Sequence, residues 1–216
     1  AVVQEHVDFN YHWYSRVRIH VPIITEPAVR FFCGADDVHM AAGEAWLFDS
    51  WRRHRVINGS ADERIHLVID IAGSAAFWQM VRQVQRSEVP MTPQVTAFEP
   101  DLKPELITER FPFAPIMAPG EMSAIVAELL DDCRANLSND PHMLNYYHDV
   151  LFDLVHDWRR QWSLYGLTPE GIAGYQGLLQ RTRSALEENP RVLVTQSNGV
   201  GINPIIVQRI LGAALQ

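Results

Sequence analysis

The stretch "EHVDFNYHWYSRVRIHVPI" (residues 5–23) decides the fold of the N-terminal part of this chain. Within it, the run Arg-Val-Arg-Ile-His (16–20) alternates polar and apolar residues. A period of two residues is typical of a β-strand with one buried face. The polar face, which carries Arg18 and His20, either meets solvent or lines a site. The residues around this strand bear on that choice.

Short runs rich in Val, Ile, Phe and Trp continue to about residue 73, separated by turn signals such as Asn58-Gly59-Ser60. Many short strands at close spacing predict a mainly β fold, a sandwich or closed barrel of the jelly-roll type. A jelly roll needs about eight strands, and fewer are visible, so the sequence predicts a core whose first strands precede residue 1 or are absent. The expected strands are 2–7, 14–24, 29–34, 44–49, 53–57 and 63–71.

After Gly73 the pattern becomes helical. Ser74 is a suitable N-cap for a first helix, and Thr168-Pro169 and Asn203-Pro204 are typical helix starts. The proline-rich segment 94–118 predicts a long ordered connection. The chain is therefore expected to have a jelly-roll core at 1–73 and a helical C-terminal region at 74–216 that packs on it. The expected helices are 75–86, 120–136, 142–164, 169–188 and one ending at Leu215, with a short strand at 191–195.

The composition excludes several classes of partner. A formal net charge of −8 and a pI near 5.5 argue against nucleic acid as the main partner, because no basic stripe is available to neutralise phosphates. No apolar run is long enough to cross a membrane. Two cysteines, Cys33 and Cys133, fit free thiols in a reducing compartment better than a disulfide framework. We expect a soluble, cytoplasmic protein.

The pair His6 and Asp8 has the spacing of two metal ligands on one strand, since residues two apart point to the same face. One carboxylate and two imidazoles form a facial triad, which suits Fe(II) because it leaves coordination positions open. A single His-x-Asp pair is equally compatible with an ordinary surface, so a second histidine is needed.

The candidate second histidine is His54, which precedes the turn at 58–60, while Arg64 follows that turn. A hairpin with a three-residue loop places His54 opposite Arg64, and both side chains then enter the same space. A two-residue loop instead places His54 opposite Glu63 and turns Arg64 away. An inward arginine needs an anionic partner, because a buried unpaired guanidinium is costly. A dicarboxylate fills that role if one end binds the metal and the other meets the guanidinium.

Taken together, these motifs resemble the aspartyl/asparaginyl β-hydroxylase family of Fe(II)- and 2-oxoglutarate-dependent dioxygenases, whose bacterial relatives include free-proline hydroxylases. The resemblance covers roughly residues 3–71, and the helical remainder carries no comparable motif. It implies a double-stranded β-helix, the cupin-like jelly roll. The motifs that carry it are His6-Val7-Asp8, Arg16-Val17-Arg18-Ile19-His20, Gly43-Glu44-x-Trp46-x-Phe48-Asp49, His54 and Arg64.

The resemblance also implies a role for each matching residue. His6, Asp8 and His54 would be the catalytic metal ligands that hold Fe(II). Arg64 would bind the distal carboxylate of 2-oxoglutarate, and His20 and Arg18 would reach carboxylates of co-substrate or substrate. O2 and 2-oxoglutarate would be consumed to hydroxylate an amino acid or a similar carboxylate, with succinate and CO2 as co-products.

Two other functions are compatible with the sequence. A cupin-like metalloenzyme would use the same three ligands without 2-oxoglutarate, and a binding module could keep the barrel without catalysis. Arg64 separates the dioxygenase from the first alternative, because a metalloenzyme that does not use 2-oxoglutarate has no need for an inward arginine. Intact ligands weigh against the second. The sequence does not identify the substrate, which could be free proline, another amino acid, a carrier-bound amino acid or a protein side chain. It also leaves the oligomeric state open.

Overall fold

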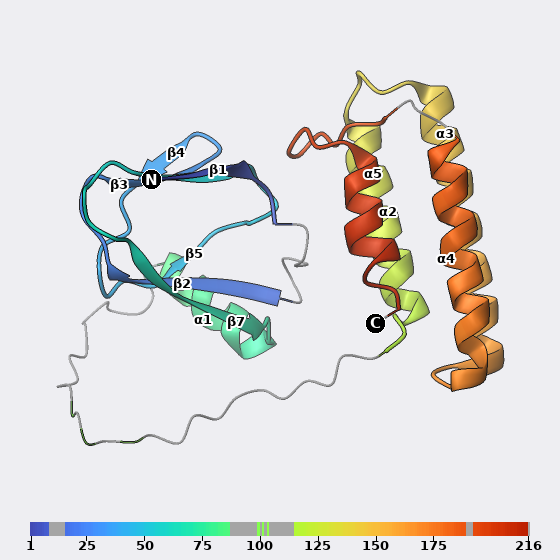
Figure 1. Cartoon of the computed structure of the whole chain (residues 1–216), viewed down its shortest axis with the longest axis horizontal. Coiled ribbons are helices and arrows are strands. Elements are labelled where there is room, and N and C mark those ends of the chain that lie inside the picture. The colour runs from blue at the N-terminus through green and yellow to red at the C-terminus, as the bar shows by residue number, and fades with distance from the viewer. Residues whose placement is uncertain are drawn as a thin grey trace. The chain divides into compact units, whose positions relative to one another are not determined.

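The structure is a computed structural model that describes residues 1–8, 16–86, 99, 101, 103, 115–188 and 192–215. The chain divides into two compact units (Figure 1). The sheet unit contains residues 1–6, 11–50 and 54–111. The helical unit contains residues 112–216 together with two short segments, 7–10 and 51–53.

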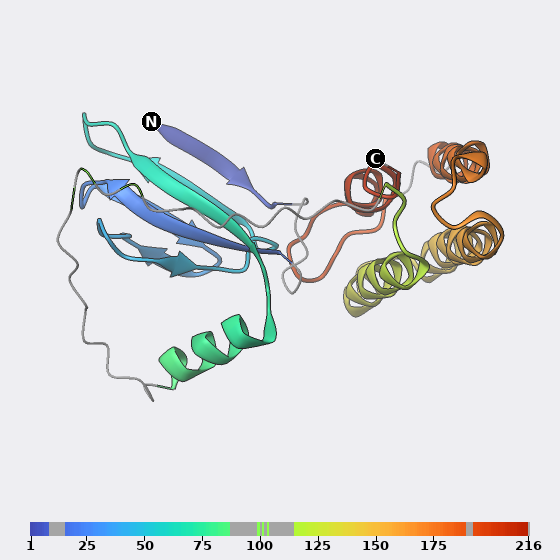
Figure 2. The same cartoon turned by 90° about the horizontal axis from the view of Figure 1, so that it is seen from below.

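The sheet unit consists of two antiparallel sheets that form two layers (Figures 1 and 2). Their strands overlap the strands expected from the sequence, but the strand expected at 44–49 is reduced to two residues, and β4 is an addition. Residues 14–15 of the strand expected at 14–24 lie outside the described residues. The antiparallel sheets expected in the N-terminal part and the helices expected after them are confirmed. Among the described residues the two sheets are not closed into a barrel, so the jelly roll is not confirmed. The four-stranded sheet has the order β1 (Val2–His6), β6 (His54–Asn58), β3 (Val29–Cys33), β4 (Asp36–Val38), and the three-stranded sheet has the order β5 (Trp46–Leu47), β2 (Arg16–Ile24), β7 (Ile65–Ala72).

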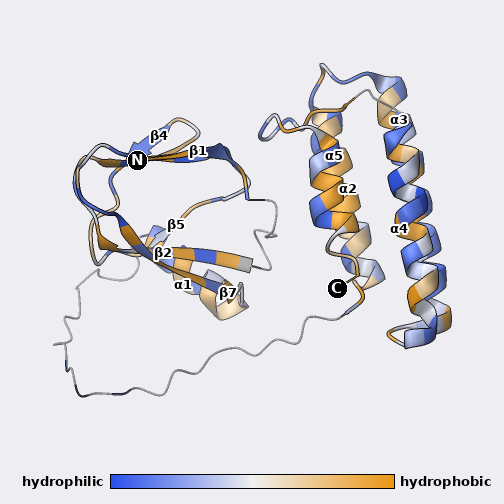
Figure 3. Ribbon diagram, viewed as in Figure 1, coloured by the Kyte–Doolittle hydropathy of each residue, from blue (hydrophilic) through white to orange (hydrophobic). Residues whose placement is uncertain are grey.

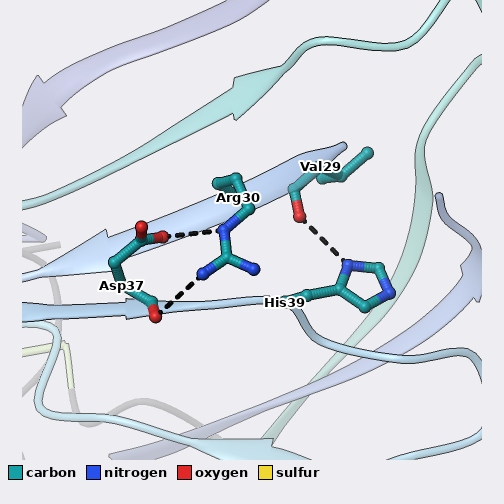
Figure 4. Close-up of polar contacts among 4 residues, drawn as sticks. All are labelled: Val29, Arg30, Asp37 and His39. Atoms are coloured by element: carbon teal, nitrogen blue, oxygen red, sulfur yellow. Dashed lines mark hydrogen bonds and ion pairs between the residues drawn. The ribbon is translucent and has the colours of Figure 1, made fainter. Parts of the chain in front are cut away.

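The core of the sheet unit is small and follows the alternation of β3, in which every second residue is buried. On the other side of β3, Arg30 pairs with Asp37 of the next strand, with 2.9 Å between Nε and Oδ1. His39 is held to the start of β3 by a contact of 3.0 Å between its Nδ1 and the carbonyl of Val29 (Figure 4). The buried core residues are Val29, Phe31, Cys33, Met40 and Val56, with Val38, Trp46 and Phe48 packed against them.

The expected hairpin between the strands at 53–57 and 63–71 is wrong. β6 pairs with β1 and β3, whereas β7 pairs with β2 in the other sheet. The turn between them is closed by Asn58, whose side-chain oxygen accepts from Ser60 N at 2.9 Å and whose amide donates to Asp62 O at 2.8 Å. This side-chain-closed turn redirects the chain to the second sheet. His54 therefore does not face Arg64 across a hairpin.

Helix α1 (Ala75–Gln85) follows β7 within the sheet unit. Its start was predicted correctly: the hydroxyl of Ser74 accepts from Phe77 N at 3.2 Å, which satisfies one of the free N–H groups at the helix start. No residue of α1 is buried.

The helical unit contains the larger core of the molecule. Helix α3 begins after Asp140, whose carboxylate accepts from His142 N at 2.8 Å. Figure 3 shows apolar residues gathered on α2 and α5 and many polar residues on the faces of α3 and α4 turned to the viewer. The elements are α2 (Pro119–Ala135), α3 (Pro141–Tyr165), the 3-10 turn η1 (Pro169–Gly171), α4 (Ile172–Glu187), α5 (Ile202–Ile205) and the π-helical turn η2 (Ile206–Leu211).

Two expectations for this half change or stay open. The strand expected at 191–195 is reduced to a single bridge between Val194 and Gly201. Most of the connection expected at 94–118 lies outside the described residues. Packing of the helices on the core at 1–73 stays a prediction.

Both cysteines are buried free thiols, as expected. Burial, and then the neighbouring Asp132, raises the pKa of Cys133 to about 12.

Across the part of the chain that the structure describes, every helix is too short or too polar to span a membrane.

Candidate metal centre

The first feature of the site is the pairing of two histidines on adjacent strands of the four-stranded sheet. Val3 on β1 pairs with Val56 on β6, but three residues later His6 pairs with His54. A regular antiparallel ladder would place His6 opposite Arg53, so β1 carries one extra residue between Val3 and His6. Such a bulge re-aims side chains and is frequent beside active sites. Here it brings the two imidazoles together, with ring centroids 4.3 Å apart.

His54 is the buried member of the pair, with 4% of its surface exposed. It begins β6 and is fixed between β1 and β3, where it pairs with Cys33. The rings of Phe48 and Phe31 lie 4.9 and 6.0 Å from its ring, measured between centroids. These contacts hold the imidazole in one orientation, as expected of a rigid metal ligand.

The tautomer of His6 is set by its own strand. Its Nδ1 lies 2.7 Å from the carbonyl oxygen of Gln4. A carbonyl oxygen only accepts hydrogen bonds, so Nδ1 carries the proton and Nε2 keeps its lone pair. A hydrogen bond from one ring nitrogen to a backbone carbonyl is the usual arrangement of a metal-binding histidine.

The third residue is Asp8, two positions after His6. One ligand atom from each of His6, Asp8 and His54 lies within 4.8 Å of the other two, so the group can hold a single metal ion. The three differ in burial: His54 is buried, Asp8 is half-buried and His6 is exposed. Two imidazoles and one carboxylate form the facial triad that suits Fe(II).

Arg64 lies just before β7 and lines a small cavity in the sheet unit. Its Nε donates to Nε2 of His66 at 3.0 Å, and burial lowers the pKa of its guanidinium. The cavity also contains Val56, which shares a face of β6 with His54. Arg64 is half-buried and lines this cavity, although the hairpin invoked to bring it beside His54 does not form. The full lining is Thr25, Val29, Phe31, Met40, Val56, Arg64 and His66.

Thr25 is a polar residue of this cavity that the sequence did not reveal. Its hydroxyl oxygen is buried and has no hydrogen-bond partner among the described residues. A buried hydroxyl beside a half-buried guanidinium suits a ligand that accepts hydrogen bonds. The register of β2 decides that Thr25 meets Arg64, and sequence spacing does not give that register.

Arg18 and His20 share a face of β2 with His66 and Asp70 of β7, as the register of the two strands requires. Arg18 forms a two-point ion pair with Asp70, with distances of 2.9 Å (Nε to Oδ1) and 3.1 Å (Nη2 to Oδ2). The ring of His20 lies 5.2 Å from that of Phe48 and 6.0 Å from that of His66. The aromatic Phe48 therefore lies beside both His20 and His54. Binding of a ligand carboxylate by these two residues stays a prediction.

The histidines of α3 form a separate surface group. His148, Phe152 and His156 stack in sequence, with ring centroids 5.6 and 6.2 Å apart. This spacing places both histidines on one helix face, as expected from their separation of eight residues.

Comparison with protein families supports the motifs. Residues 1–73 match the model of the aspartyl/asparaginyl beta-hydroxylase family, whose members are iron- and 2-oxoglutarate-dependent hydroxylases. The match ends just after β7 and includes all of the candidate site residues. It confirms the resemblance drawn from the sequence, over the N-terminal third of the chain. A comparison with curated proteins finds no match.

Proposed function

We propose that this chain is an Fe(II)- and 2-oxoglutarate-dependent dioxygenase that hydroxylates an amino acid or a closely related carboxylate. The observation that carries the proposal is the convergence of His6, Asp8 and His54, with ligand atoms within 4.8 Å of one another. The match of residues 1–73 to a hydroxylase family supports the same assignment.

His6, Asp8 and His54 would hold the iron. Because two imidazoles and one carboxylate would leave coordination positions of the iron unused, these positions would be available to the co-substrates. When bound, the iron together with 2-oxoglutarate and O2 supplies the oxidising chemistry, with succinate and CO2 as co-products. The hydrogen bond from Nδ1 of His6 to Gln4 O leaves Nε2 of the neutral ring available to the metal, and His54 would be the buried ligand of the three.

Arg64 would bind the distal carboxylate of 2-oxoglutarate. Burial lowers its pKa, which means that the charged form is partly desolvated and gains from an anionic partner. The hydroxyl of Thr25 in the same cavity would supply a second donor to that carboxylate. This pair distinguishes the proposal from a cupin-like metalloenzyme that has no use for 2-oxoglutarate.

His20 and Arg18 would orient the remaining carboxylate, from co-substrate or substrate. Because Asp70 already holds Arg18 through two contacts, a ligand has to compete for that guanidinium. We therefore assign the first contact to His20 and a secondary role to Arg18. An amino acid or amino-acid-like acid, free or attached to a larger carrier, fits a site with two guanidinium groups and an imidazole.

The decisive experiment is a turnover assay with the full chain, Fe(II), ascorbate and 2-oxoglutarate across a panel of amino acids. We expect succinate formation that one substrate class stimulates, with one oxygen atom added to that substrate by mass spectrometry. Asp8→Ala and His54→Ala should abolish both signals. If iron binds but no acid on the panel stimulates succinate formation, a metalloenzyme without 2-oxoglutarate is the better reading.

Arg64→Ala tests the co-substrate assignment separately. Truncating one partner of a buried charge pair costs about 2–5 kcal/mol, so the KM for 2-oxoglutarate should rise at least about 30-fold. Iron affinity should stay close to wild type, because Arg64 is not a ligand. Arg64→Lys should recover part of the loss. An unchanged KM in Arg64→Ala would remove the main support for 2-oxoglutarate.

A further inference from the structure

Residues 51–53, which directly precede His54, are held by a turn near the end of the chain. Arg53 donates from Nε to the carbonyl of Asn198 at 2.6 Å and from Nη2 to the carbonyl of Gly199 at 3.2 Å. In return, the side-chain amide of Asn198 donates to the carbonyl of Trp51 at 2.9 Å. The backbone of Trp51 and the side chain of Arg53 are thus both held by Asn198 and its neighbour Gly199.

The turn at 195–200 is itself closed by hydrogen bonds. The side-chain oxygen of Asn198 accepts from Val200 N at 3.0 Å and from the hydroxyl of Thr195 at 2.5 Å. Thr195 N donates to Val200 O at 3.0 Å, and Gly199 N donates to Thr195 O at 3.1 Å. Thr195 and Asn198 are buried, with 1% and 7% of their surfaces exposed. Gly199 has a positive φ of 67°, which favours glycine. This turn is a rigid platform.

A second path connects the same turn to Trp51 and to helix α2. Asp132 accepts from Ser197 N at 2.9 Å and from the Ser197 hydroxyl. That hydroxyl oxygen accepts from Nε1 of Trp51 at 2.9 Å. The guanidinium of Arg209 stacks over the Trp51 ring at 4.9 Å from its centroid. Trp51 is therefore held through its carbonyl, its indole N–H and its ring face.

We propose that the turn at 195–200, with Asn198 at its centre, is a positioning element for the metal ligand His54. The inference rests on the proposed metal centre. Because His54 follows the fixed segment 51–53 directly in the chain, the turn restrains the backbone that leads into β6. Ligand geometry has to be kept within about 0.5 Å for tight binding. The turn then contributes to metal affinity without providing a ligand.

The test is metal binding by the full-length protein, with Co(II) as the probe in calorimetry and in visible absorption. Asn198→Ala should weaken Co(II) binding about 10-fold or more, because partners that orient a ligand typically account for 10–100-fold in metal affinity. It should also change the Co(II) absorption bands, which report ligand geometry. Arg53→Ala should act in the same direction, and Arg53→Lys, which keeps one donor, should recover part of the affinity.

Tyr175→Phe is the matched control. It removes one hydrogen bond of the helical unit, from the Tyr175 hydroxyl to Gly166 O at 3.0 Å, without touching residues 51–53 or 195–200. Its Co(II) affinity should stay within about twofold of wild type, as it is not one of the partners that orient a ligand. Circular dichroism verifies that the helices are folded in every variant. If Asn198→Ala does not fold, Arg53→Ala carries the test, because the Arg53 side chain is not part of the buried core.

The outcomes separate two kinds of failure. If the wild-type chain does not bind Co(II), the proposed metal centre fails, and the positioning role fails with it. If the wild-type chain binds Co(II) and the folded Asn198 and Arg53 variants bind equally well, only the positioning role is overturned. An equal loss in Tyr175→Phe would also overturn it, since the effect would then be general destabilisation.

Discussion

The two units of this molecule divide stability and chemistry between them. In the described residues, the sheet unit buries five apolar side chains in its core, whereas the helical unit buries twenty-three. Two of the three candidate metal ligands, His6 and His54, belong to the unit with the smaller core, and Asp8 lies in the short segment 7–10 that is counted with the helical unit. Since buried apolar area is the main stabilising term in folding, most of the folding free energy should reside in the helices. A site that binds metal, by contrast, can draw part of its order from the metal.

The strongest test of this division is a change in the helical core. Trp158 is fully buried, donates from Nε1 to Met117 O at 2.9 Å and packs on Tyr175 at 4.5 Å between ring centroids. Trp158→Ala should lower the free energy of unfolding by about 3–5 kcal/mol, as truncations of buried tryptophan do. Urea denaturation followed by circular dichroism measures it. Phe152→Ala, whose side chain is 56% exposed, should cost far less, and equal losses would contradict the assignment of the core.

Metal addition should stabilise the folded protein. At a metal concentration about 100-fold above Kd, binding stabilises the folded state by about 2.7 kcal/mol. Adding Fe(II) under anaerobic conditions, or Co(II), should therefore raise the melting temperature, and chelation should reverse the shift. Scanning calorimetry of wild type and His54→Ala measures the effect. A shift of the same size in His54→Ala would place the metal elsewhere.

A smaller effect is expected from His66. Burial first, then the charges of Arg64 and His20, lowers its pKa from 6.5 to about 4. In this pH range the unfolded chain binds more protons than the folded chain, so the stability that His66 contributes is complete above pH 6.5 and is lost as pH falls towards 4. With solvent screening, the loss should be on the order of 1 kcal/mol. Unfolding of wild type and His66→Gln between these pH values tests this, and parallel curves would contradict it.

The smallest effect should come from the ion pair between Arg30 and Asp37 on the outside of β3 (Figure 4). Both side chains are largely solvated, and exposed pairs of this kind contribute about 0.2–1 kcal/mol. Arg30→Ala should change the free energy of unfolding by less than about 1 kcal/mol and leave metal affinity unchanged. Urea titration and Co(II) calorimetry measure both. A large loss of metal binding would contradict this, because it would show that the outer face of β3 influences the metal site.

Local patterns predicted most of the elements. Alternation of apolar residues located the strands, and Ser74 marked a helix start because capping depends on neighbours in sequence. The start predicted at Asn203-Pro204 is wrong, because α5 begins at Ile202 after Gly201. The group of His6, Asp8 and His54 was also accessible, since two of its members are two residues apart and the third follows a recognisable motif.

Features that depend on strand register could not be predicted from the sequence. The hairpin predicted to join His54 and Arg64 does not exist, because hydrogen-bonding partners of β6 and β7 lie in different sheets. Thr25 beside Arg64 and Asp70 beside Arg18 likewise follow from long-range pairing. The contacts of Asn198 with Trp51 and Arg53 join residues almost 150 positions apart, and no periodicity in the sequence records them.

The extra residue on β1 has a consequence in genetic terms. Because β1 holds one residue more than β6 needs between Val3 and His6, removal of one codon at Glu5 would straighten the strand and still leave His6 opposite His54. β6 has no extra residue of this kind. Removal of one of its codons would therefore shift its pairing with both neighbouring strands, β1 and β3. Related genes that differ in length at this point can therefore share the same pair of histidines, and a gap in their alignment belongs at residues 4–5.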